Sequence, residues 1–211
     1  MKFVLFVEGK TEYMGVGHFL KRWLDPRLPQ RVRVTPVKFN GVSDYCGEIA
    51  KKVRLHLSSA RRGDMIAGIG LLDLQGLDTG LKFPDGMVAT QQRWQWAKRT
   101  LEKRVARPNF RQHFAVHEIE SWLLSDINIF PFGIRRSLAA VSKAPESVNF
   151  KNPPSRFLSR IYWAKLRYKY QKAFDGPALF EQLDPDRACA KCPYLKAMLE
   201  DMLALAKAAI V

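Results

Sequence analysis

Short apolar segments alternate with amphipathic segments along the first half of the chain. The apolar segments, predicted as strands, cover residues 3–7, 31–39, 66–72 and 111–116. The amphipathic segments between them, predicted as helices, cover residues 11–23, 43–59 and 90–104. Strands that alternate with helices favour a parallel sheet covered on both faces. We therefore predict an α/β fold with a mainly parallel, four-stranded, Rossmann-like sheet flanked by helices, in which Thr11 caps the first helix.

The second part of the chain is predicted to be helical. Proline-containing breaks separate the helical segments there, which cover residues 118–125, 134–141, 155–172 and 194–209, and Pro177 is one of these breaks. We expect residues 1–126 to form the α/β core and residues 127–211 to form a helical C-terminal appendage packed on it, as one unit.

Charge and cysteine content limit the partners and the compartment. The 211 residues carry a formal net charge of +15, which favours binding to a polyanion, nucleic acid first. No apolar run is long enough for an export signal or a membrane span. The three cysteines form no disulfide framework, so we expect a cytoplasmic protein without membrane association.

Residues 151–172 form the strongest basic and aromatic segment. They hold seven basic and five aromatic residues and no acid. Basic groups neutralise phosphates and aromatic faces stack on bases, so six residues are candidates for nucleic-acid binding: Lys151, Arg156, Arg160, Lys165, Arg167 and Lys169. The alternative is an amphipathic helix whose aromatic rings pack inward while its charges stay in water, and the two interpretations are compatible on opposite faces.

Acidic residues follow the predicted strands at the points where those strands end. They are Glu8, Glu12, Asp73, Glu118 and Glu120. The carboxyl ends of parallel strands meet at one edge of a sheet, where these acids would repel one another unless a cation lies between them. Mg²⁺ prefers such oxygen ligands. Taken singly, Glu8, Glu12, Glu118 and Glu120 are more typical of helix N-termini, but their recurrence at successive strand ends favours a cation site.

Several motifs resemble a known family. Val7 to Glu12 (VEGKTE) resembles the first motif of the Toprim fold, and Asp73 stands where that fold carries an Asp-x-Asp motif. The fragments HEIESWLLSD, APE, PPSR, FDGP and CPY, in that order from His117 to Tyr194, are similar to a bacterial Toprim-like family of proteins of unknown function. That family resembles the nuclease domain of OLD-family proteins and is often encoded beside an ABC-type ATPase.

The resemblance implies roles for the strand-end acids. Glu8 would transfer a proton or bind metal, Asp73 would be a metal ligand, and Glu12, Glu118 and Glu120 would be auxiliary ligands. The second acid of Asp-x-Asp is replaced here by Gln75, which offers no charge.

We therefore predict a nuclease that uses Mg²⁺ or Mn²⁺ to cleave phosphodiesters of DNA or RNA, or carries out related phosphoryl transfer. Glu8, Lys10 and Asp73 would be its catalytic residues, with Lys10 stabilising phosphate charge. The alternatives are a non-catalytic nucleic-acid-binding or regulatory subunit of an ATPase complex, with a degraded metal site, and an interaction module for an acidic protein. The family also implies a phage-defence role; a homo-oligomer remains open.

Overall fold

The computed structural model describes residues 1–58, 64–147 and 152–210. Its strands are β1 (Lys2–Val7), β2 (Arg33–Lys38), β3 (Met65–Asp73) and β4 (Phe110–Ala115). Its helices are α1 (Gly17–Leu24), α2 (Val42–Ser58), α3 (Thr90–Val105), α4 (Glu120–Leu123), α5 (Phe132–Leu138), α6 (Pro154–Leu166), α7 (Lys172–Gln182), α8 (Pro185–Lys191) and α9 (Pro193–Ile210). A π-helical turn, η1 (Glu12–Val16), leads into α1, and 3-10 turns lie at Asp25–Arg27, Leu77–Thr79, Ile127–Ile129, Val141–Lys143 and Pro145–Ser147.

The strands form one parallel sheet in the order β2-β1-β3-β4. The predicted α/β fold is therefore confirmed. Strand β1 lies inside the sheet, and its residues from Phe3 to Val7 are all buried. Phe3, Leu5 and Val7 belong to the hydrophobic core on one face, whereas Val4 and Phe6 belong to the core on the other. A continuous apolar run is typical of such a strand, because both of its faces meet other side chains.

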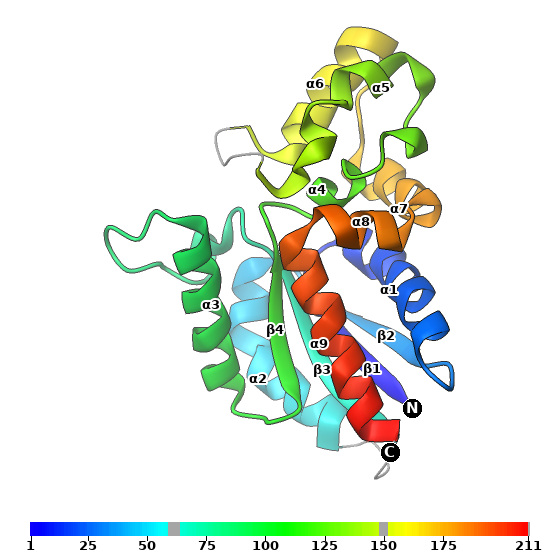
Figure 1. Cartoon of the computed structure of the whole chain (residues 1–211). Helices are drawn as coiled ribbons and strands as arrows, with labels where there is room; N and C mark the ends of the chain where they lie inside the picture. The colour runs from blue at the N-terminus through cyan, green and yellow to red at the C-terminus, as the bar shows by residue number, and fades with distance from the viewer. Residues whose placement is uncertain (59–63, 148–151, 211) are drawn as a thin grey trace.

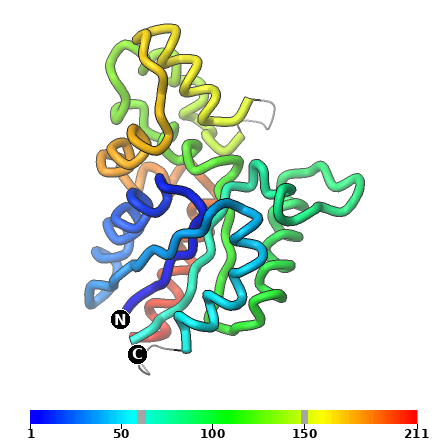
Figure 2. The backbone as a smooth tube through the Cα atoms, turned by 180° about the vertical axis from the view of Figure 1, so that it is seen from behind, coloured from blue at the N-terminus to red at the C-terminus, as the bar shows by residue number. Residues whose placement is uncertain are grey.

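Two layers of helices cover the sheet (Figure 1). Helix α1 contacts β2 and α9 contacts β3 and β4 on one face, while α2 contacts β1 and β3 and α3 contacts β4 on the other. Helices α5 and α6 lie beyond the carboxyl ends of the strands, and the two chain termini lie near each other at the opposite end (Figures 1 and 2). The segment between β3 and α3 extends away from the sheet (Figure 2).

The C-terminal region differs from the prediction in several places. The helix predicted over residues 155–172 ends earlier, at Leu166, because Arg167 takes a left-handed conformation (φ 55°). Helix α7, which begins at Lys172, and helix α8 were not predicted. Pro177, predicted as a break, lies inside α7. Helix α9 returns to pack along β3 and β4, so it belongs to the helical layer that covers one face of the sheet.

The predicted cap at Thr11 is also wrong. The Thr11 side chain makes no capping bond to the helix that follows, and its Oγ1 donates instead to the backbone oxygen of Lys172, 2.8 Å away. No helix in the described part of the chain is long and apolar enough to cross a membrane.

Candidate active site

Four carboxylates gather where β1, β3 and β4 end. Glu8 follows β1, Glu12 lies in the η1 turn four residues later, Asp73 is the last residue of β3 and Glu120 is the first residue of α4. Glu12, Asp73 and Glu120 are buried, with 2%, 7% and 0% of their surfaces exposed. The structure thus brings together four of the five predicted acids, in a protein whose surface charge is strongly positive.

Lys172 places an ammonium group among these acids. Its Nζ lies 2.9 Å from Asp73 Oδ2, 3.0 Å from Glu120 Oε2 and 3.9 Å from Glu12 Oε1. Sequence reasoning placed Lys172 at the end of a basic helix and missed this role. The contact joins residues 99 positions apart, so no local pattern could have indicated it.

The start of α7 holds Lys172 in place. Besides accepting the Thr11 hydroxyl, this segment is fixed by Asp175, whose Oδ2 accepts the backbone N–H of Gln171 at 2.6 Å. Gly176 lets α7 approach the loop after β1, because a Cβ there would lie 2.5 Å from Thr11 Cγ2. The lysine is therefore positioned by packing between α7 and that loop.

Asp73 is held on both of its oxygens. Its Oδ1 accepts the backbone N–H of Ile119 at 2.9 Å, and its Oδ2 accepts from Lys172. Strand β3 thus ends in a carboxylate whose orientation is fixed by two segments. They are the turn between β4 and α4, and the first residue of α7.

Burial changes the protonation of the cluster. Burial, aided by the charge of Asp73, raises the pKa of Glu8 and that of Glu12 to about 7. Burial also raises the pKa of Glu120 to about 8, although Lys172 acts in the opposite direction. Burial alone would lower the pKa of Lys172, but the neighbouring carboxylates outweigh it and hold this pKa well above its usual value. At neutral pH the carboxyls of the cluster therefore still hold protons in part. A divalent cation that binds to these carboxyls would displace those protons.

Glu118 has a different partner from the other four acids. Its carboxylate accepts the backbone N–H of Ser155 at 2.7 Å and the Ser155 hydroxyl at 3.0 Å. It therefore binds the N-terminal turn of α6, where a negative charge is favourable. Glu118 is close enough to raise the pKa of Glu120, but no contact joins it to Lys172.

Gln75 lies just past the end of β3. Its backbone N–H donates to the oxygen of His117 at 2.9 Å, and its side-chain Oε1 is buried without a hydrogen-bond partner. Burial lowers the pKa of His117 to about 4, so this imidazole is neutral at pH 7 and adds no positive charge.

The acids fit a divalent cation in their chemistry. Buried oxygens of Glu12 (Oε2) and Glu120 (Oε1) have no hydrogen-bond partner, and carboxylate oxygens are the ligands that Mg²⁺ takes. Their present arrangement suits an ammonium group, however. Among the described residues no three His, Cys, Asp or Glu side chains converge on one point as a metal site would require, and Lys172 holds the central position. A cation that binds here must share or displace that position.

The predicted nucleic-acid-binding residues lie on the surface. Lys151 is outside the described residues, whereas the other five are exposed on α6 and the segment after it: Arg156, Arg160, Lys165, Arg167 and Lys169. Tyr162 and Tyr170 point into the core, while Trp163 and Tyr168 are exposed. The segment therefore packs aromatic rings inward and leaves its basic residues exposed, as the amphipathic interpretation expects, while nucleic-acid binding by the exposed face stays a prediction. Lys10 is exposed too, with its Nζ 4.8 Å from the centre of the Phe174 ring.

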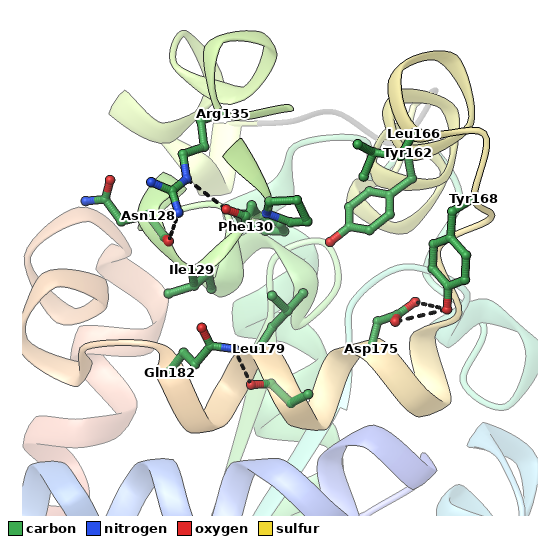
Figure 3. A pocket seen from close by; sticks show the side chains of 12 residues that line it. Asn128, Ile129, Phe130, Arg135, Tyr162, Leu166, Tyr168, Asp175, Leu179 and Gln182 are labelled. Atoms are coloured by element: carbon green, nitrogen blue, oxygen red, sulfur yellow. Dashed lines mark hydrogen bonds between the residues drawn. The ribbon is translucent and has the colours of Figure 1, made fainter. Parts of the chain in front are cut away.

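A separate pocket of about 480 Å³ lies between the α5–α6 region and α7 (Figure 3). Several of its polar side chains have partners within the chain. Arg135 donates to the backbone oxygens of Asn128 and Phe130, and the Tyr168 hydroxyl donates to Asp175. None of the four clustered acids lines this pocket.

The comparisons with known proteins fit this fold. A family model described as a domain of unknown function (DUF4276) matches residues 7–203. The chain belongs to this family. No curated protein matches its sequence.

Solved structures of OLD proteins are similar to the chain. The C-terminal region of the Burkholderia pseudomallei OLD protein is 14% identical, with a TM-score of 0.51 and 98% of each chain covered. The C-terminal region of the Xanthomonas campestris pv. campestris OLD protein is 16% identical, with a TM-score of 0.45 and 96% of each chain covered. At such low identity the likeness to the Burkholderia structure shows a shared fold alone.

Proposed function

We propose that this protein is a metal-dependent nuclease of the Toprim type, which cleaves phosphodiesters of nucleic acid with Mg²⁺ or Mn²⁺. The observation that carries the proposal is the burial of Glu12, Asp73 and Glu120, beside Glu8, at the carboxyl ends of the strands. Burying acids together destabilises a fold unless cations, hydrogen bonds or protonation offset the cost, and such clusters are typical of functional sites. In a protein of charge +15, this gathering of acids is a specific feature, and the single ammonium of Lys172 lies among four carboxylates.

Each residue of the cluster has a proposed part. Asp73, fixed on both oxygens, would hold the metal together with Glu12 and Glu120, and the metal would supply Lewis-acid stabilisation of the phosphate. Glu8 has a pKa of about 7, so it is suited to accept or donate a proton near neutral pH. Lys172 would keep Asp73 and Glu120 in place and offer its ammonium to phosphate oxygens.

The exposed basic residues would hold the substrate. Arg156 and Arg160 on α6, with Lys165, Arg167 and Lys169 after them, present positive charge near the end of the molecule where the carboxylates lie. Contacts of this kind bind the phosphate backbone without regard to sequence. Lys10, two residues after Glu8, would add charge at the site itself.

A second candidate function follows from Lys172. Since this ammonium already neutralises part of the acid cluster and Gln75 replaces a possible ligand, the chain could bind nucleic acid without cleaving it. It would then be the nucleic-acid-binding or regulatory subunit of a complex with an ABC-type ATPase. We propose that this complex acts in the cytoplasm and takes part in phage defence. Either function is compatible with the basic surface.

A cleavage assay separates the two candidates. The purified chain is incubated with labelled single-stranded DNA, double-stranded DNA and RNA, with Mg²⁺, with Mn²⁺ or with EDTA. Asp73→Asn and Glu12→Gln are compared with Glu48→Gln, which changes an exposed acid of α2. The nuclease proposal expects metal-dependent cleavage that the first two variants abolish and the third retains. Binding without cleavage under every metal condition would favour the second candidate.

A further inference from the structure

A groove of about 700 Å³ lies at the outer edge of β2. Pro36, Val37 and Lys38 line it from the strand, and Lys10, Tyr13 and Met14 line it from the segment after β1. His56 of α2 completes the lining. Its volume is in the range of pockets that hold a small molecule or one unit of a polymer.

The groove lies directly beside the proposed active site. Lys38 ends β2 and pairs in register with Val7, the residue before Glu8. Lys10 follows Glu8 by two residues, and Tyr13 follows Glu12. The groove and the carboxylates therefore both adjoin the segment that follows β1.

The lining combines aromatic and apolar surface with positive charge. The exposed fractions of Tyr13 and Met14 are 45% and 51%, which is high for large hydrophobic side chains. Lys10 and Lys38 are exposed beside them, and no acid is present among the described residues that line the groove. Pro36 lacks the backbone N–H that an added peptide strand would need at this edge, which argues against a peptide as the occupant.

We propose that this groove binds one unpaired nucleotide of a nucleic-acid strand, with its base on Tyr13 and Met14 and its phosphate near Lys10 and Lys38. A base can stack on a side chain only when it has left its own duplex. The inference rests on the proposed function and gives it a substrate class: the protein acts on single-stranded nucleic acid or on an unpaired segment.

Binding is measured by fluorescence anisotropy with labelled oligothymidylate and with the duplex that it forms with oligodeoxyadenylate, both in EDTA. Tyr13→Ala should weaken single-strand binding about tenfold, which is the loss expected for one base stacked on a ring, and should leave duplex binding unchanged. Tyr13→Phe should bind as the natural chain does. Phe132→Ala, which removes an aromatic ring that is 87% exposed on α5, is the matched control and should also bind normally.

Salt dependence tests the phosphate position. Lys38→Ala should reduce the slope of log affinity against log salt by about 0.7, the value for one phosphate contact of a single strand. An unchanged slope would contradict that position.

Three results would overturn the groove itself. In the first, Tyr13→Ala and Phe132→Ala bind single strands equally well. In the second, Tyr13→Ala loses single-strand and duplex binding to the same extent. In the third, polyglutamate competes for the groove, and this competition depends on Tyr13. Because metal is absent, a failure of the nuclease proposal leaves this assay intact: Tyr13-dependent binding would then coexist with no cleavage.

Discussion

Lys172→Met tests whether the ammonium of Lys172 stabilises the carboxylate cluster. Methionine keeps much of the side-chain volume, but it leaves Asp73 and Glu120 buried without their positive partner. Removing one partner of a buried ion pair costs about 3–5 kcal/mol. Since 35% of the Lys172 side chain is exposed, solvent screens part of this interaction, and we expect the free energy of unfolding to fall by about 2–3 kcal/mol.

The loss should depend on pH. The raised pKa values of Glu12 and Glu120 mean that both carboxyls are protonated in the folded state in acid and ionise above about pH 7 to 8. A carboxyl whose pKa is higher in the folded state than in the unfolded state destabilises the fold as pH rises. The loss begins near the pKa of the unfolded state and is complete above the pKa of the folded state. Without Lys172 these pKa values rise further. The variant should therefore lose more stability at about pH 8.5 than at about pH 5.5.

Urea unfolding at the two pH values measures the effect. For a domain of this size the expected loss corresponds to a fall in Tm of roughly 4–12 °C. Lys169→Met, at an exposed neighbouring position, is the matched control and should change stability by less than about 0.5 kcal/mol. The reasoning would be refuted if both variants unfolded alike at both pH values.

Three further predictions concern the packing and the charge of the site. Gly176→Ala should lower Tm, because the new methyl would meet Thr11; a thermal melt equal to that of the natural chain would contradict the close approach. Glu118→Gln should lower the free energy of unfolding in urea by about 1 kcal/mol, because it weakens the bonds to Ser155. The affinity for Mn²⁺ should stay unchanged. Weaker Mn²⁺ binding would show instead that Glu118 is a ligand. Binding of Mg²⁺ near pH 7 should release protons from the carboxyls with raised pKa, so the affinity for Mg²⁺ should increase from about pH 6 to about pH 8. Calorimetry in two buffers of different ionisation enthalpy measures the proton release. An affinity that does not change with pH would contradict this prediction.

The sequence predicts the sheet because burial on both faces leaves a direct pattern. The apolar run from Phe3 to Val7 is continuous for this reason, and the acids Glu8 and Asp73 mark where strands end. Parallel strands then bring those acids to one edge, as the structure shows. The C-terminal helices were harder to predict, since Arg167 ends α6 by its backbone conformation and Pro177 lies within α7.

The partners of the acids could not be predicted from the sequence. Lys172 reaches Asp73 across 99 residues, and Ser155 reaches Glu118 across 37. Both contacts arise from helices that pack over the sheet edge, whereas periodicity reports only on near neighbours. Glu118 and Glu120 are two residues apart in sequence, yet one binds the start of α6 and the other faces Lys172.

If the acids at the strand ends bind a catalytic cation, the chain should bind Mn²⁺ through them. Calorimetric titration with Mn²⁺ compares the natural chain with Asp73→Asn and with Gln75→Asp. The second variant places an acid where the Asp-x-Asp motif of the Toprim fold has its second Asp. The account predicts binding by the natural chain, a loss of at least about tenfold in Asp73→Asn, and equal or tighter binding in Gln75→Asp. Binding seen only in Gln75→Asp would contradict the claim and identify a metal site that this chain has lost.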